Sequence, residues 1–301
     1  FGILESKEGG VLPVTVRNIE AKIPSEKLSL PALDGQMQRL ADDQEAKLVT
    51  WLSRVEHATH GRYVTSGKQQ VYQAPGMYSV FEQTDKSLGT PQAIRVTKSA
   101  GRKACEVVGI PLKKPGFYVV ELASPRLGAA LFNDKRPYYV STAALVTNMS
   151  AHFKQGRESS LVWVTALDSG KPIPNAMVTV RYCTGASVWQ GRTDQNGIAH
   201  IEKELGEHPY NLCEGWNSGY LVTARSADDM TFVLSSWSQG IQPWDFKVDY
   251  GRGDARAWAA HTVFDRTLLR AGETVHMKHY FRKRTGQGFA TVGESGFPDR
   301  L

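Results

Sequence analysis

The sequence predicts a mainly β protein built from tandem β-sandwiches of the immunoglobulin or fibronectin type, with one helix inserted in the first domain. Two observations lead to this prediction. Short runs of β-branched and aromatic residues alternate with polar ones along most of the chain. Residues that favour turns separate these runs at regular intervals. A chain of 301 residues also exceeds one ordinary domain and suggests two or three.

The clearest domain is expected at residues 141–250, where seven runs have the composition of strands. The segment 168–172, Asp-Ser-Gly-Lys-Pro, separates two of them, and the pair Asn196-Gly197 favours a tight turn between two others. Seven short strands over roughly 100 residues are typical of an immunoglobulin-like sandwich. We expect Trp163 to fill its core. The predicted strands are residues 144–153, 159–167, 176–183, 187–192, 198–201, 219–226 and 230–237.

The first domain, residues 1–140, is less regular and is expected to be a β-sandwich that carries one helix. A strand is predicted at residues 11–23, and the apolar spacing then changes to a helical one. Asp34 is the expected N-cap and Gly61 the expected stop, so the helix is predicted at about residues 36–57. Further strands are predicted at residues 61–73, 92–97, 105–112, 117–122 and 138–141.

Residues 257–301 read as the start of a third, incomplete domain. A strand at 262–264 precedes Asp265-Arg266, residues 270–274 form a tight turn, and an alternating run follows at 275–281. About two strands are fewer than a stable sheet needs. The chain also begins at Phe1 without an initiating methionine, so we interpret it as a piece of a longer protein.

The charge of the chain does not indicate a nucleic-acid partner. The net charge is +6, but Lys and Arg are interleaved with Asp and Glu, and no nucleic-acid-binding motif accompanies them. No apolar run approaches the ~18–20 residues that span a bilayer.

Motifs of catalysis and cofactor binding are also absent from the sequence. It contains no GxSxG, no phosphate-binding loop and no Cys/His spacing suited to zinc. His276 and His279 point to opposite faces of a predicted strand, which is poor geometry for a shared metal ion. We therefore expect no catalytic residue, no cofactor and no metal, and a protein that is not an enzyme.

Two sets of residues are candidates for structural roles. The three cysteines permit a disulfide bond between Cys183 and Cys213 with Cys105 free, and two reduced, buried cysteines are the alternative. Trp237, Ile241 and Trp244 form an apolar exit from the second domain. They would pack either against the neighbouring domain or against a partner protein.

Three blocks of the sequence resemble the bacterial α2-macroglobulins. The first is 153–165, followed by the turn at 168–172; the second is 228–233, with Trp237 and Pro243-Trp244. The third, residues 264–276, is similar to the family signature DRPxYRPGETV. Leu269 and Ala271 stand where that signature has Tyr and Pro, which suits bacterial relatives, including a subgroup without a thioester.

The resemblance implies tandem macroglobulin-type sandwiches in a periplasmic protease trap whose parent protein is anchored to the inner membrane. It also favours the bond between Cys183 and Cys213, since the periplasm is oxidising. No Cys-x-Glu-Gln thioester motif or bait region is recognisable, so this segment would be scaffold. Its partners would then be other envelope proteins and, through the parent, target proteases. The alternative is a set of immunoglobulin-like modules of a bacterial surface adhesin, in which turns like 168–176 and 193–197 are also common.

Overall fold

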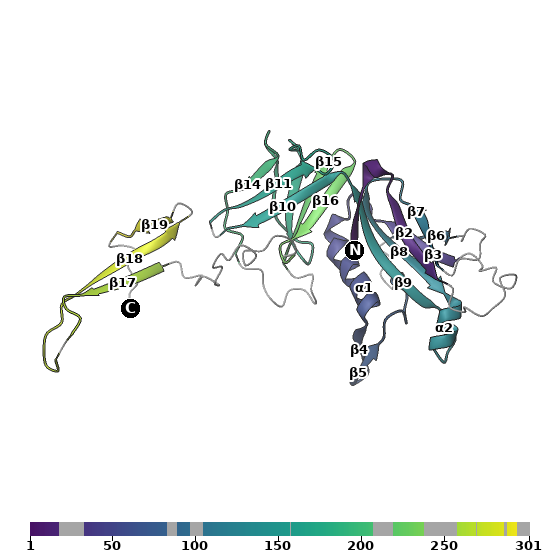
Figure 1. The fold of residues 1–301 in the computed structure, drawn as a ribbon, viewed down its shortest axis with the longest axis horizontal. Helices are drawn as coiled ribbons and strands as arrows, with labels where there is room; N and C mark the ends of the chain where they lie inside the picture. The colour runs from purple at the N-terminus through teal and green to yellow at the C-terminus, as the bar shows by residue number, and fades with distance from the viewer. Residues whose placement is uncertain are drawn as a thin grey trace.

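A computed structural model describes nine stretches of the chain: residues 1–17, 33–82, 89–96, 105–156, 158–206, 219–237, 258–268, 270–285 and 288–293. The fold is mainly β, as predicted, and is arranged in three blocks along the chain (Figure 1). Within these stretches, no helix is both long and apolar enough to cross a membrane.

The first block is centred on a five-stranded sheet with the order β1-β9-β8-β3-β6. Its first strand runs parallel to β9, and the other neighbours are antiparallel. The strand bounds are β1 Gly2–Glu5, β3 Leu33–Arg39, β6 Gln92–Val96, β8 Gly116–Ser124 and β9 Tyr138–Thr147. Strand β8 lies near the middle of the sheet, and Phe117–Leu122 within it is buried throughout, as expected for a strand covered on both faces.

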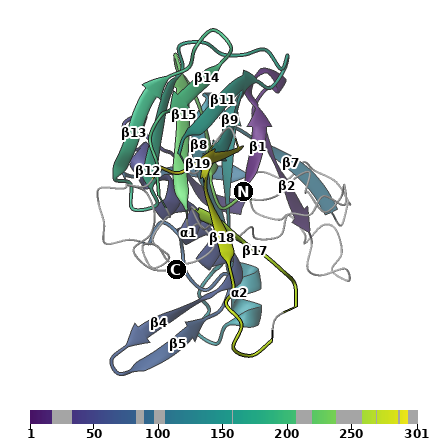
Figure 2. The same ribbon diagram turned by 90° about the vertical axis from the view of Figure 1, so that its left-hand side faces the viewer.

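Different elements cover the two faces of this sheet. A two-stranded ribbon of β2 (Val11–Arg17) and β7 (Cys105–Pro111) covers one face, and Ile110 packs there against Tyr118 and Val120 of β8. Helix α1 (Leu48–His60) covers the other face, where it contacts Phe117 and Val119. The hairpin of β4 (Arg62–Ser66) and β5 (Gln69–Gln73) projects beyond the end of α1 (Figures 1 and 2).

The predicted helix at residues 36–57 is wrong in its first third and right in its second half. Residues 33–39 form strand β3, which pairs with β6 on one side and β8 on the other. The apolar spacing of Met37 and Leu40 fits a helix locally, but pairing with two distant strands outweighs that local preference. The helix proper starts at Leu48 after the 3-10 turn η2 (Glu45–Lys47) and ends at His60, three residues beyond the predicted end, with Gly61 as the expected stop.

The first block also contains a second helix that the sequence pattern did not indicate. Helix α2 (Pro125–Leu131) follows β8 directly. Ser124 caps it, because its Oγ accepts a hydrogen bond from the backbone N–H of Leu127 at 3.4 Å, and Pro125 supplies a preset first helical residue. The expectation of a single helix in this domain is therefore wrong.

The second block is a sandwich of two sheets, and its strands agree closely with the predicted ones. The sheets have the orders β10-β11-β14 and β13-β12-β15-β16. A shared core, including Val162, Val178, Ile201 and Val222, fills the space between them. The bounds are β10 Met149–Gln155, β11 Ser160–Ala166, β12 Met177–Tyr182, β13 Ser187–Arg192, β14 Ile198–Ile201, β15 Tyr220–Ser226 and β16 Asp229–Leu234.

Two details of the second block differ from expectation. The run predicted as one strand, 144–153, is two strands, because β9 ends at Thr147 and β10 starts at Met149 in another sheet. Trp163 does not fill the core and is 42% exposed. Its neighbours Val162 and Val164 both face inward, so strand alternation turns Trp163 outward, where its ring lies 5.6 Å from that of His152.

The third block is an antiparallel sheet with the order β17-β18-β19, one strand more than expected. The bounds are β17 Trp258–Phe264, β18 Met277–Thr285 and β19 Gly288–Thr291. The signature-like segment is the connection between the first two strands. Gly272, with a φ of 89°, takes a turn conformation that suits glycine, and the Glu273 carboxylate accepts a hydrogen bond from the Arg270 backbone N–H at 3.1 Å.

Candidate functional site: the junction between the first two blocks

The chain passes from the first block to the second through a single residue, Asn148. Its backbone N–H donates to the Asp229 carboxylate at 2.8 Å, and its side chain exchanges hydrogen bonds with Asp168. Lys7, from the first block, forms an ion pair with Asp168, and that hydrogen bond holds the pKa of the Asp168 carboxyl below its usual value. Hydrogen bonds and an ion pair therefore link Asn148 and Asp168 to residues of both blocks.

The outer face of the sheet β13-β12-β15-β16 is buried, although it faces away from the core of its own sandwich. On β15, the inward side chains Tyr220, Val222 and Ala224 alternate with Leu221 and Thr223, which are 0% and 1% exposed. In an isolated sandwich this outer face would be solvated and polar. Its burial means that another element covers it.

Helix α1 is that covering element, and it lies between the two blocks (Figure 1). One continuous cluster of buried residues joins the helix to the sheets on both sides. From the helix it includes Trp51, Leu52 and Val55; from the first sheet, Phe117, Val119, Ala143 and Leu145; from the second block, Cys183, Leu221, Met230, Phe232 and Leu234. The two blocks thus share one hydrophobic core.

A buried ion-pair network lies at the edge of this core. Glu45, in the turn η2 before α1, is 9% exposed and faces three side chains of the second block. Its Oε1 accepts from Arg225 Nε at 2.8 Å, and its Oε2 accepts from Thr223 Oγ1 at 2.8 Å. Arg181 is 3.5 Å from the same carboxylate and donates to Thr223 Oγ1 at 2.9 Å. All the charges are paired, as burial requires.

Two further contacts tighten the junction. In the β12–β13 turn, Gly185 has a φ of 93°, and a Cβ at this position would lie 2.9 Å from the Ala46 carbonyl oxygen. Only a residue without a side chain allows that approach. Arg225 also reaches the loop before η2, donating from Nη2 to the backbone oxygen of Asp42 at 3.2 Å.

Aromatic rings from both blocks also pack together at the junction. Phe1 lies 5.4 Å from Phe232 and 5.5 Å from Trp237, measured between ring centroids. Phe117, from the first sheet, lies 5.9 Å from Phe232 at an interplanar angle of 73°. Pairs at these separations add to the stabilisation from burial alone. Trp237 therefore contacts rings of this chain, and 37% of it stays exposed to solvent.

Of the predicted interface residues, Trp237 alone lies within the described part of the chain, and it packs at the junction. Ile241 and Trp244 lie outside the described residues. Cys183 is disulfide-bonded and 4% exposed. Cys213, its predicted partner, also lies outside the described residues, so that pairing stays a prediction.

Sequence reasoning missed Glu45, Arg181 and Arg225. The signal that would have indicated the buried outer face is the sequence of β15, Tyr-Leu-Val-Thr-Ala-Arg-Ser, in which apolar residues are continuous rather than alternating. Such a run is typical of a strand covered on both faces. No local signal pairs Arg225 with Glu45, because 180 positions separate them.

A second buried carboxyl lies in the first block. Glu121 on β8 is 3% exposed, and its carboxyl accepts hydrogen bonds from Ser79 Oγ, the Val80 backbone N–H and Ser141 Oγ at 2.5, 2.7 and 2.9 Å. Burial raises the pKa of Glu121 above its ordinary value, and these three hydrogen bonds oppose that rise. Its contacts fix the 77–82 segment onto the sheet, which is a structural role.

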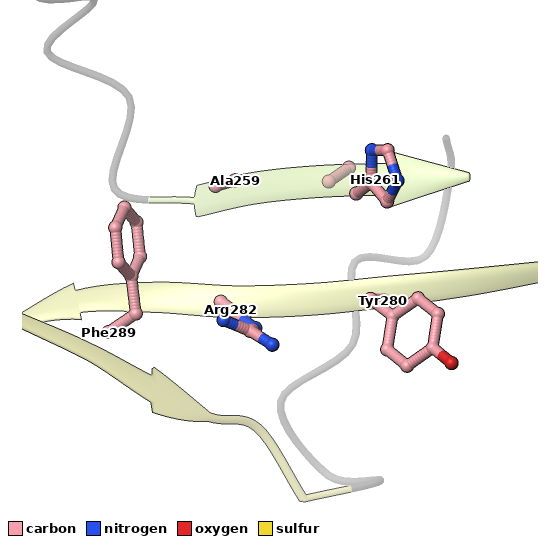
Figure 3. A pocket seen from close by; sticks show the side chains of 6 residues that line it. Ala259, His261, Tyr280, Arg282 and Phe289 are labelled. Carbon is pink, nitrogen blue, oxygen red and sulfur yellow. The ribbon is translucent and has the colours of Figure 1, made fainter. Parts of the chain in front are cut away.

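The third block carries a shallow, mainly apolar pocket of about 380 Å³ (Figure 3). It is lined by Ala259, Ala260, His261, Tyr280, Arg282 and Phe289. Phe289 is 56% exposed and Tyr280 is 41% exposed, so this sheet presents large side chains to solvent. Elsewhere too, the described residues contain no group of three or more His, Cys, Asp or Glu side chains that could hold a metal ion.

Comparison with known proteins agrees with this architecture. Residues 146–253, which include strands β10 to β16, match the sequence profile of the bacterial alpha-2-macroglobulin MG3 domain. Two curated relatives named alpha-2-macroglobulin, from Xylella fastidiosa strains 9a5c and Temecula1, are 26% and 25% identical over 180 residues. Those residues are 58% of this chain and 9% of each relative, so the chain spans a small part of their length.

The fold is similar to that of a solved relative. The crystal structure of trypsin activated alpha-2-macroglobulin from Escherichia coli covers 94% of this chain, and the match takes up 16% of that protein, with a TM-score of 0.52 and 15% sequence identity. The chain is thus similar to bacterial alpha-2-macroglobulins, and its residues 146–253 match the MG3 domain of that family.

Proposed function

We propose that this chain is a rigid scaffold segment of a periplasmic alpha-2-macroglobulin-type protease inhibitor that acts in bacterial envelope defence. The single observation that supports this most is the hydrophobic core shared by the two blocks through α1. Domains that merely follow one another have smaller and more polar interfaces and move relative to each other. A segment built in this way transmits force between its ends instead of bending.

Three further observations support the proposal. The match of residues 146–253 to the bacterial MG3 domain supports a macroglobulin-type scaffold. The curated relatives and the solved relative carry the name alpha-2-macroglobulin, and the solved one is described as trypsin activated. The disulfide bond of Cys183 fits an oxidising compartment such as the periplasm. None of these relatives is described as an adhesin, so the adhesin alternative gains no support from them.

In this proposal the segment performs no chemistry of its own. Its partners are the neighbouring domains of the parent protein and other envelope proteins, and target proteases are engaged through the parent. Anchoring of the parent to the inner membrane and the absence of a thioester belong to the same proposal.

The test uses the full-length protein that carries this segment. After incubation with trypsin, a trap keeps the protease in a complex that cleaves a small chromogenic peptide but is protected from a large protein inhibitor. We expect this protection for the natural protein and a marked loss of it for Glu45→Ala, which breaks the junction. Asp43→Ala, an exposed neighbour of Glu45, is the matched control and should keep full protection.

Two results would contradict the proposal. One is a natural full-length protein that a panel of proteases only degrades, without retaining any of them. The other is full protection in the Glu45→Ala variant together with a measured loss of rigidity between the two blocks, because the rigid junction would then be irrelevant to trapping.

A further inference from the structure

The strands of the third block carry positive charge and no negative charge. β17, β18 and β19 contain no Asp or Glu, whereas β18 alone contains two Lys and two Arg. The connection between β17 and β18 has one Asp and one Glu, and both pair with Arg266, at 3.7 Å for Asp265 and 3.4 Å for Glu273. Their charge is therefore already matched, and the sheet has an excess of positive charge.

The pairing register divides the side chains of the sheet between its two faces. In an antiparallel sheet, residues directly opposite each other point to the same face, and successive residues of a strand point to opposite faces. Arg282 pairs with Ala259, and Tyr280 pairs with His261. These four residues therefore share one face with Lys278, which lies two positions before Tyr280. We call it the basic face.

The opposite face of the sheet is largely apolar. Phe264 pairs there with Met277, and Ala260 pairs with Phe281. When a second layer packs on a sheet, it covers the apolar face and leaves the polar face to solvent. The basic face is therefore the outer face of this sheet.

The shallow pocket of the third block belongs to the basic face, because Ala259, His261, Tyr280 and Arg282 all line it (Figure 3). The side chain of Ala259 is a single methyl group, which leaves space among the larger side chains around it. Phe289 adds a second exposed aromatic ring to the lining. Pockets for drug-sized ligands measure roughly 300–1,000 Å³. A volume of about 380 Å³ is small on that scale and accommodates one large side chain.

The two cations of the basic face, Lys278 and Arg282, are exposed and make no ion pair with any residue that the structure describes. Lys278 lies over the Tyr280 ring, with its Nζ 5.2 Å from the ring centroid. The planar fork of an arginine guanidinium fits a carboxylate through two parallel hydrogen bonds. Both cations are thus available to acidic groups from outside the chain.

The composition of the basic face favours a protein partner over a nucleic acid. Tyr, Phe and Arg are enriched at protein interfaces, where an anchoring side chain fills a pocket on the partner. A strong nucleic-acid site depends on many phosphate contacts, on the order of 6–10. The described side chains of this face supply two Lys or Arg cations, which match two carboxylates.

We propose that the basic face is a docking surface for an acidic segment of a partner protein. An aromatic or large apolar side chain of that segment occupies the pocket between Tyr280 and Phe289, and Asp or Glu carboxylates beside it pair with Arg282 and Lys278. This inference does not rest on protease trapping, because it concerns a surface of the third block and a binding event that needs no protease.

Isothermal titration calorimetry of the complete chain tests the proposal with terminally blocked peptides. The probe is Glu-Glu-Phe-Glu-Glu, for which we expect saturable binding that weakens as salt is added. Gln-Gln-Phe-Gln-Gln lacks the charges and should bind about tenfold more weakly or worse, since hydrogen bonds to charged groups are lost. Glu-Glu-Ala-Glu-Glu lacks the anchoring ring and should also bind more weakly. A single-stranded oligomer of ten thymidines represents the rival class of partner.

Arg282→Gln should weaken binding of the probe about tenfold. The matched control is Lys283→Gln, which removes the same charge at the next position of β18 but on the opposite face, where the side chain is also exposed. It should change the affinity by about twofold or less, as an unpaired surface charge does. Tyr280→Ala should likewise weaken binding, and Met277→Ala, on the opposite face, should not.

The proposal is overturned if the probe does not bind saturably, if it binds no more tightly than its Gln counterpart, or if the thymidine oligomer binds more tightly. It is equally overturned if Arg282→Gln and Lys283→Gln, both folded by circular dichroism, weaken binding to the same extent. Self-association of the chain that Arg282→Gln abolishes would show that a second copy occupies the face instead. A chain that binds the probe while its parent retains no protease would contradict the proposed function alone.

Discussion

Arg225 donates a hydrogen bond from Nε to Oε1 of Glu45 at 2.8 Å, across the junction between the first two blocks, although 180 positions separate the two residues in sequence. The Glu45 side chain is 12% exposed and that of Arg225 is 22% exposed, so water screens the pair only weakly. Together with Arg181 and Thr223, this pair fixes how the second sandwich sits against the turn that begins α1.

Replacing Glu45 with alanine should destabilise the chain strongly. The change leaves Arg181 and Arg225 without their shared carboxylate in a mostly buried place, which costs about 3 kcal/mol in the free energy of unfolding. Urea denaturation measures this loss. The exposed Asp43→Ala control should stay within about 0.5 kcal/mol of the natural chain. Equal effects of the two substitutions would show that the network does not stabilise the junction.

A methyl group at Gly185 should test the close approach of the two blocks. Gly185→Ala adds a Cβ 2.9 Å from the Ala46 carbonyl oxygen, at a φ of 93°. Gly170→Ala is the control, because φ there is 64° and the added Cβ meets nothing within 4 Å. We expect about 1 kcal/mol of destabilisation for the control from backbone strain alone, and about 2–4 kcal/mol for Gly185→Ala. If both variants have the same melting temperature, the blocks do not meet at this turn.

The free energy of unfolding should depend on pH partly through the Glu121 carboxyl. Its folded pKa is raised above the ordinary value of 4.5, so the folded state binds more protons than the unfolded state in that range. The resulting contribution is fully present below pH 4.5 and is lost as the pH rises through the folded pKa.

Glu121→Gln removes this titration. The free energy of unfolding of the natural chain minus that of the variant should therefore fall as pH rises. The free energy of unfolding, measured by urea denaturation between pH 4 and 8, checks this. A Glu121 difference that stays flat or grows with pH would refute a raised pKa for this carboxyl.

The disulfide partner of Cys183 can be identified directly. We expect peptide mapping without reductant to find Cys183 joined to Cys213, and thiol titration of the denatured protein to find one free thiol, that of Cys105. Closing this loop of roughly 30 residues contributes about 3–4 kcal/mol in the chain-entropy account. Cys213→Ser should lower the melting temperature accordingly, and Cys105→Ser should not. A bond between Cys183 and Cys105 would contradict the assignment.

Strand prediction succeeds where turn residues flank a run with the composition of a strand. The predicted strands 187–192 and 198–201 have the bounds of β13 and β14, because turns flank them and their side chains alternate. Residues 36–39 form a strand instead of the predicted helix, since their apolar spacing is locally ambiguous. Their pairing with β6 and β8 depends on strands that come far later in the chain.

The sequence identifies only some of the residues of the candidate site. Trp237 stands out because an aromatic side chain at the end of a strand run is conspicuous. Glu45 and Arg225 do not stand out in the sequence, because a charged residue is expected to be exposed to solvent. Only the fold shows that each is the partner of the other.

The sequence by itself determined the class of fold, the seven strands of the second sandwich and the macroglobulin resemblance, because each depends on local alternation, turn chemistry or residue identity. The tertiary structure alone decided that α1 would be shared between two sheets, that a single residue would connect them and that a buried ion pair would fix their geometry. These features arise from contacts between segments distant in sequence, whose energies no local pattern encodes.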